Sequence, residues 1–104
     1  MRTSISFKQT ERSEAIESLI EQKLKHFEKY DHQKNSHIEW VCNANEKLHT
    51  SEVNLHMENT IFHTKVESND LYKTIDIAIS KLDSQIRKHS DKAKDHLSDV
   101  KNRV

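Results

Sequence analysis

The sequence of 104 residues predicts a two-layer α+β domain with the element order β-α-β-β-β-α. Four short segments alternate apolar and polar residues, which is typical of strands with one buried face. Two longer segments place apolar residues three and four positions apart, as amphipathic helices do. Because only one face of each predicted strand is clearly apolar, we expect a four-stranded sheet with both helices packed on the same face.

The first strand and the first helix occupy the N-terminal third of the chain. Residues 2–8 alternate, with Ile5 and Phe7 on one face. Ser13 is a suitable N-cap for a helix that we expect to run to about Tyr30. The predicted apolar stripe of this helix consists of Ala15, Ile16, Leu19, Ile20, Leu24, Phe27 and Tyr30.

Three further strands follow a polar loop at residues 31–36. Alternation predicts them at 37–44, 52–58 and 61–66. A right-handed βαβ crossover would place the strand at 37–44 parallel to the first strand, and hairpins would add the other two.

The last hairpin has a predicted register. A two-residue turn at Asn59 and Thr60 places the apolar residues of both strands on the same face. It would pair Met57 with Phe62, Leu55 with Thr64 and Val53 with Val66. On the opposite, open face this register makes His56 and His63 cross-strand neighbours.

The second helix is predicted to begin after an N-cap at Asp70. Its buried stripe would contain Leu71, Ile75, Ala78, Ile79, Leu82 and Ile86. Helical character extends toward Asp95, and residues 97–104 read as a frayed polar tail. We therefore expect one domain at residues 1–96, followed by a polar tail at 97–104.

Charge is balanced overall but uneven along the chain. Seventeen Lys and Arg offset seventeen Asp and Glu. Residues 1–70 carry nine basic and twelve acidic side chains, whereas residues 71–104 carry eight and five. At about 100° per residue, three lysines would lie close together beside the buried stripe of the second helix: Lys81, Lys88 and Lys92. Such cations suit phosphate binding, although lysines near helix ends also complement the helix dipole.

The composition argues against several function classes. The chain has no glycine, which a standard P-loop, a dinucleotide-binding fingerprint and an EF-hand all need. No apolar run approaches the roughly 20 residues of a membrane span, and no apolar signal region is present, so we expect a cytoplasmic protein. Cys42 is expected in the core beside Trp40, and no buried carboxylate pair is evident. We therefore expect no enzyme activity and no cofactor.

The eight histidines raise the question of a metal site. His56 and His63 would be neighbours on the open sheet face, with Glu39 or Glu58 as a third ligand if that face is arranged favourably. Two ligands do not make a tight site, so we expect no bound metal.

The predicted second helix contains Asp70–Asp76 (DLYKTID), Lys81–Leu82, Gln85 and Lys88–Lys92 (KHSDK). This pattern resembles the second helix of the ribosome hibernation promoting factors, a family that includes the ribosome-associated inhibitor A proteins and was formerly described as modulating sigma-54. Two other regions are similar to the same family: His49–Ser51, Leu55–His56 and His63 in the strands, and Ser13–Ile16, Lys23 and Tyr30 in the first helix. The resemblance extends from Ile5 to about His96.

The resemblance implies a fold similar to double-stranded RNA-binding domains. It also implies binding to the 30S subunit and its 16S rRNA, within 70S or 100S ribosomes, near the A and P sites. Translation would then be inhibited in starvation or stationary phase, with no membrane and no small-molecule substrate involved. The positions that match basic residues of the family pattern are Lys23, Lys81, Arg87, Lys88 and Lys92.

The sequence departs from this family at two positions of the second helix. Ser84 stands where many members carry Arg, and Thr74 replaces a usual Ala. Two other interpretations remain open at this point: a general double-stranded RNA-binding module and a protein-interaction domain. The chain resembles the short members of the family, and its sequence does not decide whether it promotes or opposes ribosome dimerisation.

Overall fold

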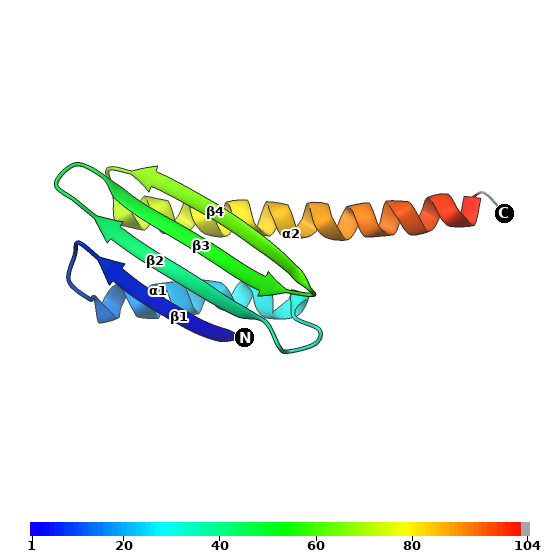
Figure 1. Cartoon of the computed structure of the whole chain (residues 1–104), viewed down its shortest axis with the longest axis horizontal. Helices are drawn as coiled ribbons and strands as arrows, with labels where there is room; N and C mark the ends of the chain where they lie inside the picture. The colour runs from blue at the N-terminus through cyan, green and yellow to red at the C-terminus, as the bar shows by residue number, and fades with distance from the viewer. Residues whose placement is uncertain (103–104) are drawn as a thin grey trace.

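The computed structural model describes the backbone of residues 1–102 and the side chains of residues 1–90. Its elements are β1 (Arg2–Lys8), α1 (Glu14–Leu24), the 3-10 helix η1 (Lys25–Tyr30), β2 (His37–Ala44), β3 (His49–Met57), β4 (Thr60–Ser68) and α2 (Leu71–Asn102). The sheet order is β1-β2-β3-β4, with β1 parallel to β2 and the other pairs antiparallel. Figure 1 shows the sheet as one layer and both helices as the other. The predicted α+β fold is confirmed.

The first helix starts where the sequence predicts, and its helical turns end at the predicted Tyr30, although the α-helix itself ends at Leu24. Ser13 caps it, because its Oγ accepts a hydrogen bond from the Ile16 backbone N–H at 3.2 Å. After Leu24 the helix tightens into the 3-10 form of η1, which continues to Tyr30. Ala15 was expected in the apolar stripe but is exposed.

The core fills the space between the sheet and the two helices. Its buried side chains are Ile16, Ile20, Leu24, Phe27, Ile38, Trp40, Cys42, Val53, Leu55, Met57, Phe62, Val66, Ile75, Ala78, Leu82 and Ile86. These residues include most of the predicted stripes of both helices. The inward position predicted for Trp40 and Cys42 is therefore confirmed.

A hydrogen-bonded chain of polar side chains crosses this core. Trp40 Nε1 donates to Ser51 Oγ at 3.1 Å, and Ser51 Oγ lies 2.9 Å from Thr74 Oγ1. The Thr74 hydroxyl in turn donates to the Leu71 carbonyl oxygen, so Ser51 is the donor to Thr74. The side-chain polar groups of Trp40, Ser51 and Thr74 thus each have a partner, which removes the cost of burying them unsatisfied. This chain gives Thr74 a structural role in joining α2 to β2 and β3.

The register of the β3–β4 hairpin differs from the predicted register by two residues. The turn is formed by Glu58 and Asn59, with φ values of 53° and 59°, as a two-residue turn of type I′ requires. Thr60 could not serve as a turn residue there, because a β-branched side chain disfavours positive φ. Glu58 has no intrinsic preference for this turn, but its carboxylate accepts a hydrogen bond from the His32 backbone N–H at 3.1 Å.

The two-residue shift changes every predicted pair while keeping each residue on its predicted face. The observed partners are Met57 with Thr60, Leu55 with Phe62, Val53 with Thr64 and Ser51 with Val66. The predicted pairs of Met57 with Phe62, Leu55 with Thr64 and Val53 with Val66 are wrong.

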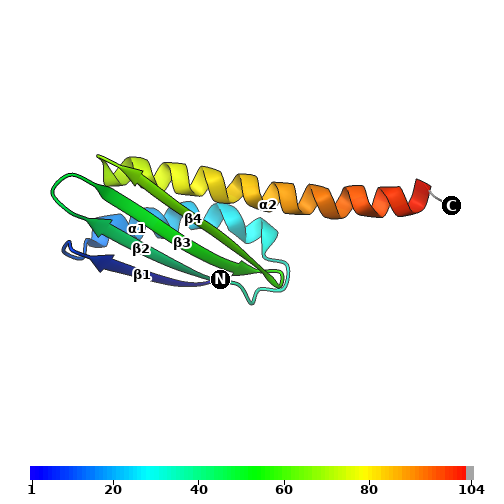
Figure 2. The same cartoon turned by 45° about the horizontal axis from the view of Figure 1, so that its top comes forward.

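The second helix begins as predicted and is longer than predicted. Asp70 Oδ1 accepts a hydrogen bond from the Tyr72 backbone N–H at 3.0 Å. Figure 2 shows α2 continuing past the end of the sheet. Residues 97–102, expected as a frayed tail, belong to this helix, and residues 103–104 lie outside the described part of the chain. No helix among the described residues is both long and apolar enough to cross a membrane.

Candidate nucleic-acid interface

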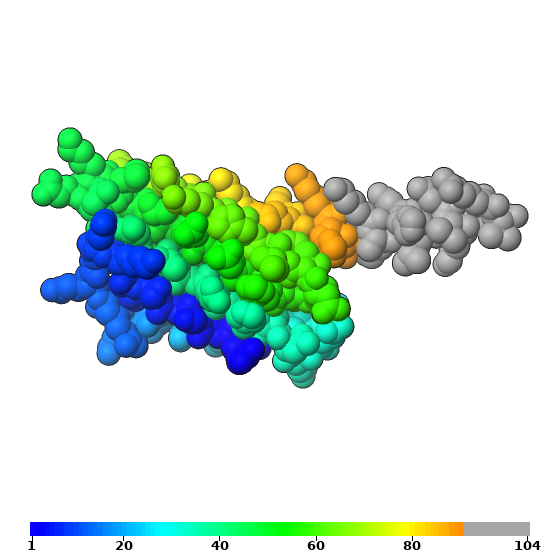
Figure 3. Space-filling view, in the orientation of Figure 1, coloured from blue at the N-terminus to red at the C-terminus, as the bar shows by residue number. Residues whose placement is uncertain are grey.

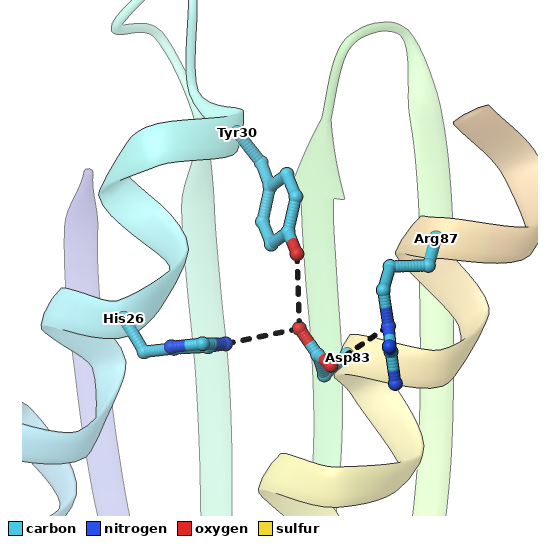
Figure 4. Close-up of polar contacts among 4 residues, drawn as sticks. All are labelled: His26, Tyr30, Asp83 and Arg87. Carbon is cyan, nitrogen blue, oxygen red and sulfur yellow. Dashed lines mark hydrogen bonds and ion pairs between the residues drawn. The ribbon is translucent and has the colours of Figure 1, made fainter. Parts of the chain in front are cut away.

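The two helices meet along a line of polar side chains that we call the α1–α2 seam. It is formed by Lys23, His26 and Tyr30 from the first helix and Asp76, Asp83 and Arg87 from α2. Figure 4 shows its central cluster, in which three side chains point at the Asp83 carboxylate. His26 Nε2 lies 3.0 Å and Tyr30 OH 3.1 Å from Oδ1, while Arg87 Nε lies 3.0 Å from Oδ2.

The surroundings of Asp83 stabilise its charged form. Partial burial raises the pKa of this carboxyl, but hydrogen bonds from His26 and Tyr30 and the charge of Arg87 outweigh that effect. The net result is a pKa lowered from the ordinary value of 3.8. Asp83 is therefore ionised at neutral pH and offsets the positive charge of Arg87.

A second ion pair lies in the same seam. Lys23 Nζ is 2.7 Å from Asp76 Oδ1, and the Lys23 side chain is 34% exposed. Both sequence-predicted cations that lie in the seam, Lys23 and Arg87, thus face an aspartate. Exposed pairs of this kind contribute little to stability, but they reduce the local positive potential.

The opposite side of α2 has a different character. Gln85 Nε2 donates to the His63 carbonyl oxygen of β4 at 2.9 Å, so this side lies along the edge of the sheet. At about 100° per residue, Lys81 and Lys88 lie close to Gln85 and on the far side of the helix from Asp83. We call Lys81, Gln85 and Lys88 the outer flank.

The two lysines of the outer flank are exposed. Within residues 1–90, neither has an acidic partner within ion-pair distance. Two neighbouring cations on a rigid helix produce a local positive potential, which attracts phosphate groups. The outer flank is the part of the predicted site with this character.

The five sequence-predicted residues are therefore not equivalent. Lys23 and Arg87 belong to the seam, and Lys81 and Lys88 belong to the outer flank. The side chain of Lys92 lies outside the described residues. The sequence analysis missed the cluster around Asp83, although the spacing of Asp83 and Arg87, four residues apart on one helix, is a recognised signal for an ion pair.

Two other candidate residues have clear surroundings. Cys42 is fully buried, and burial, with the nearby charge of Glu17, raises the pKa of its thiol to about 11. It is therefore a neutral thiol at physiological pH, unlike a catalytic cysteine. Tyr72 is 54% exposed at the start of α2.

The predicted histidine pair on the open sheet face is wrong, because it relied on the incorrect register. His63 is paired with Asn54, and His63 Nδ1 lies 2.8 Å from Asn54 Oδ1. The cross-strand neighbours of His56 are Ile61 on one side and His37 on the other. Glu58, one of the two suggested third ligands, lies in the hairpin turn.

Comparison with known protein families identifies relatives along nearly the whole chain. A model of the family described as Sigma 54 modulation protein / S30EA ribosomal protein matches residues 3–94. The ribosome hibernation promoting factor of Escherichia coli K12 is 32% identical over 96 residues, which cover 92% of this chain and 100% of that protein. The ribosome hibernation promotion factor of Bacillus subtilis is 31% identical over 94 residues, which cover 88% of this chain and 50% of that protein.

Two solved structures have the same fold. A ribosomal subunit interface protein from Coxiella burnetii superposes with a TM-score of 0.77 at 23% identity, covering 88% of this chain and 99% of that one. The N-terminal domain of Thermus thermophilus Protein Y gives a TM-score of 0.78 at 22% identity, covering 86% and 99%. These likenesses confirm the arrangement of the sheet and the two helices.

Proposed function

The chain belongs to the Sigma 54 modulation protein / S30EA ribosomal protein family, and we propose that it is a ribosome hibernation factor. It binds the small ribosomal subunit near the A and P sites and inhibits translation in starvation or stationary phase. Its partners are the 30S subunit and 16S rRNA within 70S or 100S ribosomes. It acts in the cytoplasm and catalyses no reaction.

The observation that carries the proposed binding surface is the outer flank of α2. Lys81 and Lys88 are exposed and have no acidic partner among residues 1–90. They lie on the helix that carries the family-like pattern in residues 70–92. Contacts from lysines to phosphates supply affinity that depends on salt and not on base sequence.

The proposed mechanism is steric occlusion. The domain is a rigid block, because α2 is anchored to the sheet by its buried stripe and by the Thr74 hydrogen bonds. Phosphate contacts position such a block without reading sequence, and the shape of the ribosomal cleft supplies the specificity. A block held there prevents messenger and transfer RNA from entering.

The seam contributes less to this binding. Lys23 and Arg87 each share their charge with an aspartate of the same protein, so contact with a phosphate would have to compete with Asp76 or Asp83. We therefore rank Lys81 and Lys88 above Lys23 and Arg87. Lys92 is placed with the outer flank on its sequence spacing alone.

The decisive experiment measures co-sedimentation with 30S and 70S particles over a range of salt concentrations. The test variant is K81E/K88E, which reverses two exposed charges. The matched control is K34E/K47E, which makes the same change of net charge at exposed loop positions. All four lysines are exposed, so both variants should fold, and circular dichroism would verify this.

We expect K81E/K88E to weaken ribosome binding by about 100-fold or more at low salt, because two phosphate contacts are lost and two repulsions are added. K34E/K47E should bind nearly as well as the wild type. If wild-type protein fails to sediment with ribosomes at any salt concentration, the proposed function is wrong. If K81E/K88E binds as tightly as K34E/K47E, the proposed surface is wrong. Free duplex RNA, added as competitor, should not displace the protein; displacement would favour a general duplex-binding module.

A further inference from the structure

The open face of the sheet brings together three side chains that can bind a metal ion. His37 in β2 and His56 in β3 are direct cross-strand partners, and Glu39 lies two residues after His37 on the same face. One donor atom from each of the three lies within 4.8 Å of the others. Figure 3 views this face directly; both helices pack against the opposite face of the sheet.

The two imidazole rings are held side by side. Their centroids are 4.1 Å apart, with only 10° between the ring planes. Antiparallel pairing sets this spacing, because directly opposed side chains on one face of a sheet lie about 5 Å apart. The two strands therefore keep the rings together in the folded protein.

The donor atoms are not engaged elsewhere among the described residues. None of the three side chains has a hydrogen bond within residues 1–90, and the distance from His37 Nε2 to Glu39 Oε1, 3.9 Å, is too long for one. His63 on the same face differs, since its ring nitrogen lies 2.8 Å from the Asn54 side-chain oxygen. The three side chains thus have lone pairs that no other described residue uses.

We propose that His37, Glu39 and His56 form a binding site for a divalent transition-metal ion such as Zn²⁺. Two imidazoles and one carboxylate are a donor set that suits Zn²⁺, Ni²⁺ and Cu²⁺, whereas Mg²⁺ and Ca²⁺ prefer oxygen ligands alone. Such a site has three protein ligands and leaves further coordination positions to water or to another molecule. This site is independent of the proposed ribosome-binding surface, which lies on α2.

The required adjustment is small. Donor atoms around a tetrahedral Zn²⁺ lie about 3.4 Å apart when each bond is close to 2.1 Å. The donors here need to approach one another by roughly 1 Å, which side-chain rotation can supply. His37 and His56 are half-buried and Glu39 is exposed, so the side chains have room to rotate while the strands stay in place.

The neighbouring charges modulate this site without blocking it. Arg2 of β1 is the cross-strand partner of His37, and its positive charge opposes a second cation. Glu39 offsets that charge, and Glu58 is held in the adjacent hairpin turn by His32.

The test is isothermal titration calorimetry of the purified full chain with Zn²⁺, and with Mg²⁺ as the hard-cation control. The variants are H37Q, H56Q and E39Q. The matched control is H63Q, which removes an exposed histidine from the same face. Thermal unfolding in EDTA shows whether each variant is folded before the metal is added.

We expect one strong Zn²⁺ site in the wild type and none for Mg²⁺. H37Q and H56Q should each weaken Zn²⁺ binding by at least about 10-fold, with a smaller loss for E39Q, whereas H63Q should bind like the wild type. Zn²⁺ should also raise the unfolding temperature of the wild type and H63Q, but not that of H56Q.

The proposal is overturned if the wild type has no site of one-to-one stoichiometry, or if H63Q loses as much affinity as H56Q. If H37Q or H56Q does not fold in EDTA, paramagnetic Co²⁺ or Ni²⁺ is added to wild-type protein and its histidine NMR signals are followed. Selective broadening of His37 and His56 supports the site, and uniform broadening of all exposed histidines contradicts it. The assay contains no ribosomes, so its result is separate from that of the proposed function.

Discussion

Basic side chains lie on both sides of α2, but only those on one side are paired with acidic residues. In the α1–α2 seam, Lys23 and Arg87 each lie within 3.0 Å of an aspartate oxygen. On the outer flank, Lys81 and Lys88 project from the same rigid helix beside Gln85, with no acidic partner among residues 1–90. Counting basic residues therefore does not locate a phosphate-binding surface.

The comparison also separates two physical roles for charge. The Asp83 charge helps to hold η1 against α2, because its carboxylate accepts hydrogen bonds from His26 and Tyr30. Among residues 1–90 the outer-flank lysines have no acidic partner, and we propose that their charges contact a phosphate of the ribosome.

The first prediction compares neutral substitutions on the two sides. K81Q/K88Q and K23Q/R87Q each remove two positive charges. Lost phosphate contacts lower the slope of log affinity against log salt by about one each, so K81Q/K88Q should lower it by about two. K23Q/R87Q should lower it by less than one, since Asp76 and Asp83 already offset those charges. Sedimentation assays at several salt concentrations give both slopes. Equal slopes for the two variants would contradict the distinction between the outer flank and the seam.

The second prediction concerns the stability of the seam. D83N removes the charge that accepts hydrogen bonds from His26 and Tyr30 and forms an ion pair with Arg87. It should lower the free energy of unfolding by about 1–2 kcal/mol at pH 7. The folded-state pKa of Asp83 lies below 3.8, so its stabilising effect is present above that pH and is lost as the pH falls through the folded value.

Urea unfolding of wild type and D83N between pH 7 and pH 2 measures this difference. The two curves should converge below pH 3.8. A constant gap over the whole range would show that the Asp83 charge is not what stabilises the seam.

The third prediction uses the buried face of α2 as a reference. T74A removes the hydroxyl that satisfies Ser51 and should cost about 1–2 kcal/mol in the free energy of unfolding. T74S keeps the hydroxyl and is the matched control, with a smaller loss. Neither variant should change the salt slope of ribosome binding, because neither alters a surface charge. A changed slope with T74A would mean that the outer flank depends on the packing beneath it.

The smallest expected effect belongs to the exposed seam pair. D76N should change the free energy of unfolding by less than about 0.5 kcal/mol, as is usual for surface ion pairs. It also releases Lys23, so ribosome affinity should rise slightly at low salt. Thermal unfolding and sedimentation of D76N against wild type would check both results, and lower affinity would contradict the account of the seam.

The sequence alone determined the elements and their faces. Strand periodicity depends only on residues two apart and helix periodicity on residues three and four apart, so the boundaries of β2 and the burial of Trp40 follow from local pattern. The caps at Ser13 and Asp70 are local for the same reason. The position of Lys81 and Lys88 on one side of α2 also follows from helical spacing alone.

Tertiary structure decided what depends on residues distant in the chain. The hairpin register depended on Glu58, which accepts a hydrogen bond from the backbone N–H of His32, 26 residues earlier in the chain. The seam depended on Tyr30 and His26 meeting Asp83, more than 50 residues later. The proposed metal site depended on the pairing of His37 with His56 across two strands. The physical reason is the same for all three. Propensity and periodicity act between residues that are near in sequence. The neutralisation of a charge and the completion of a ligand set depend instead on which faces of the fold pack together.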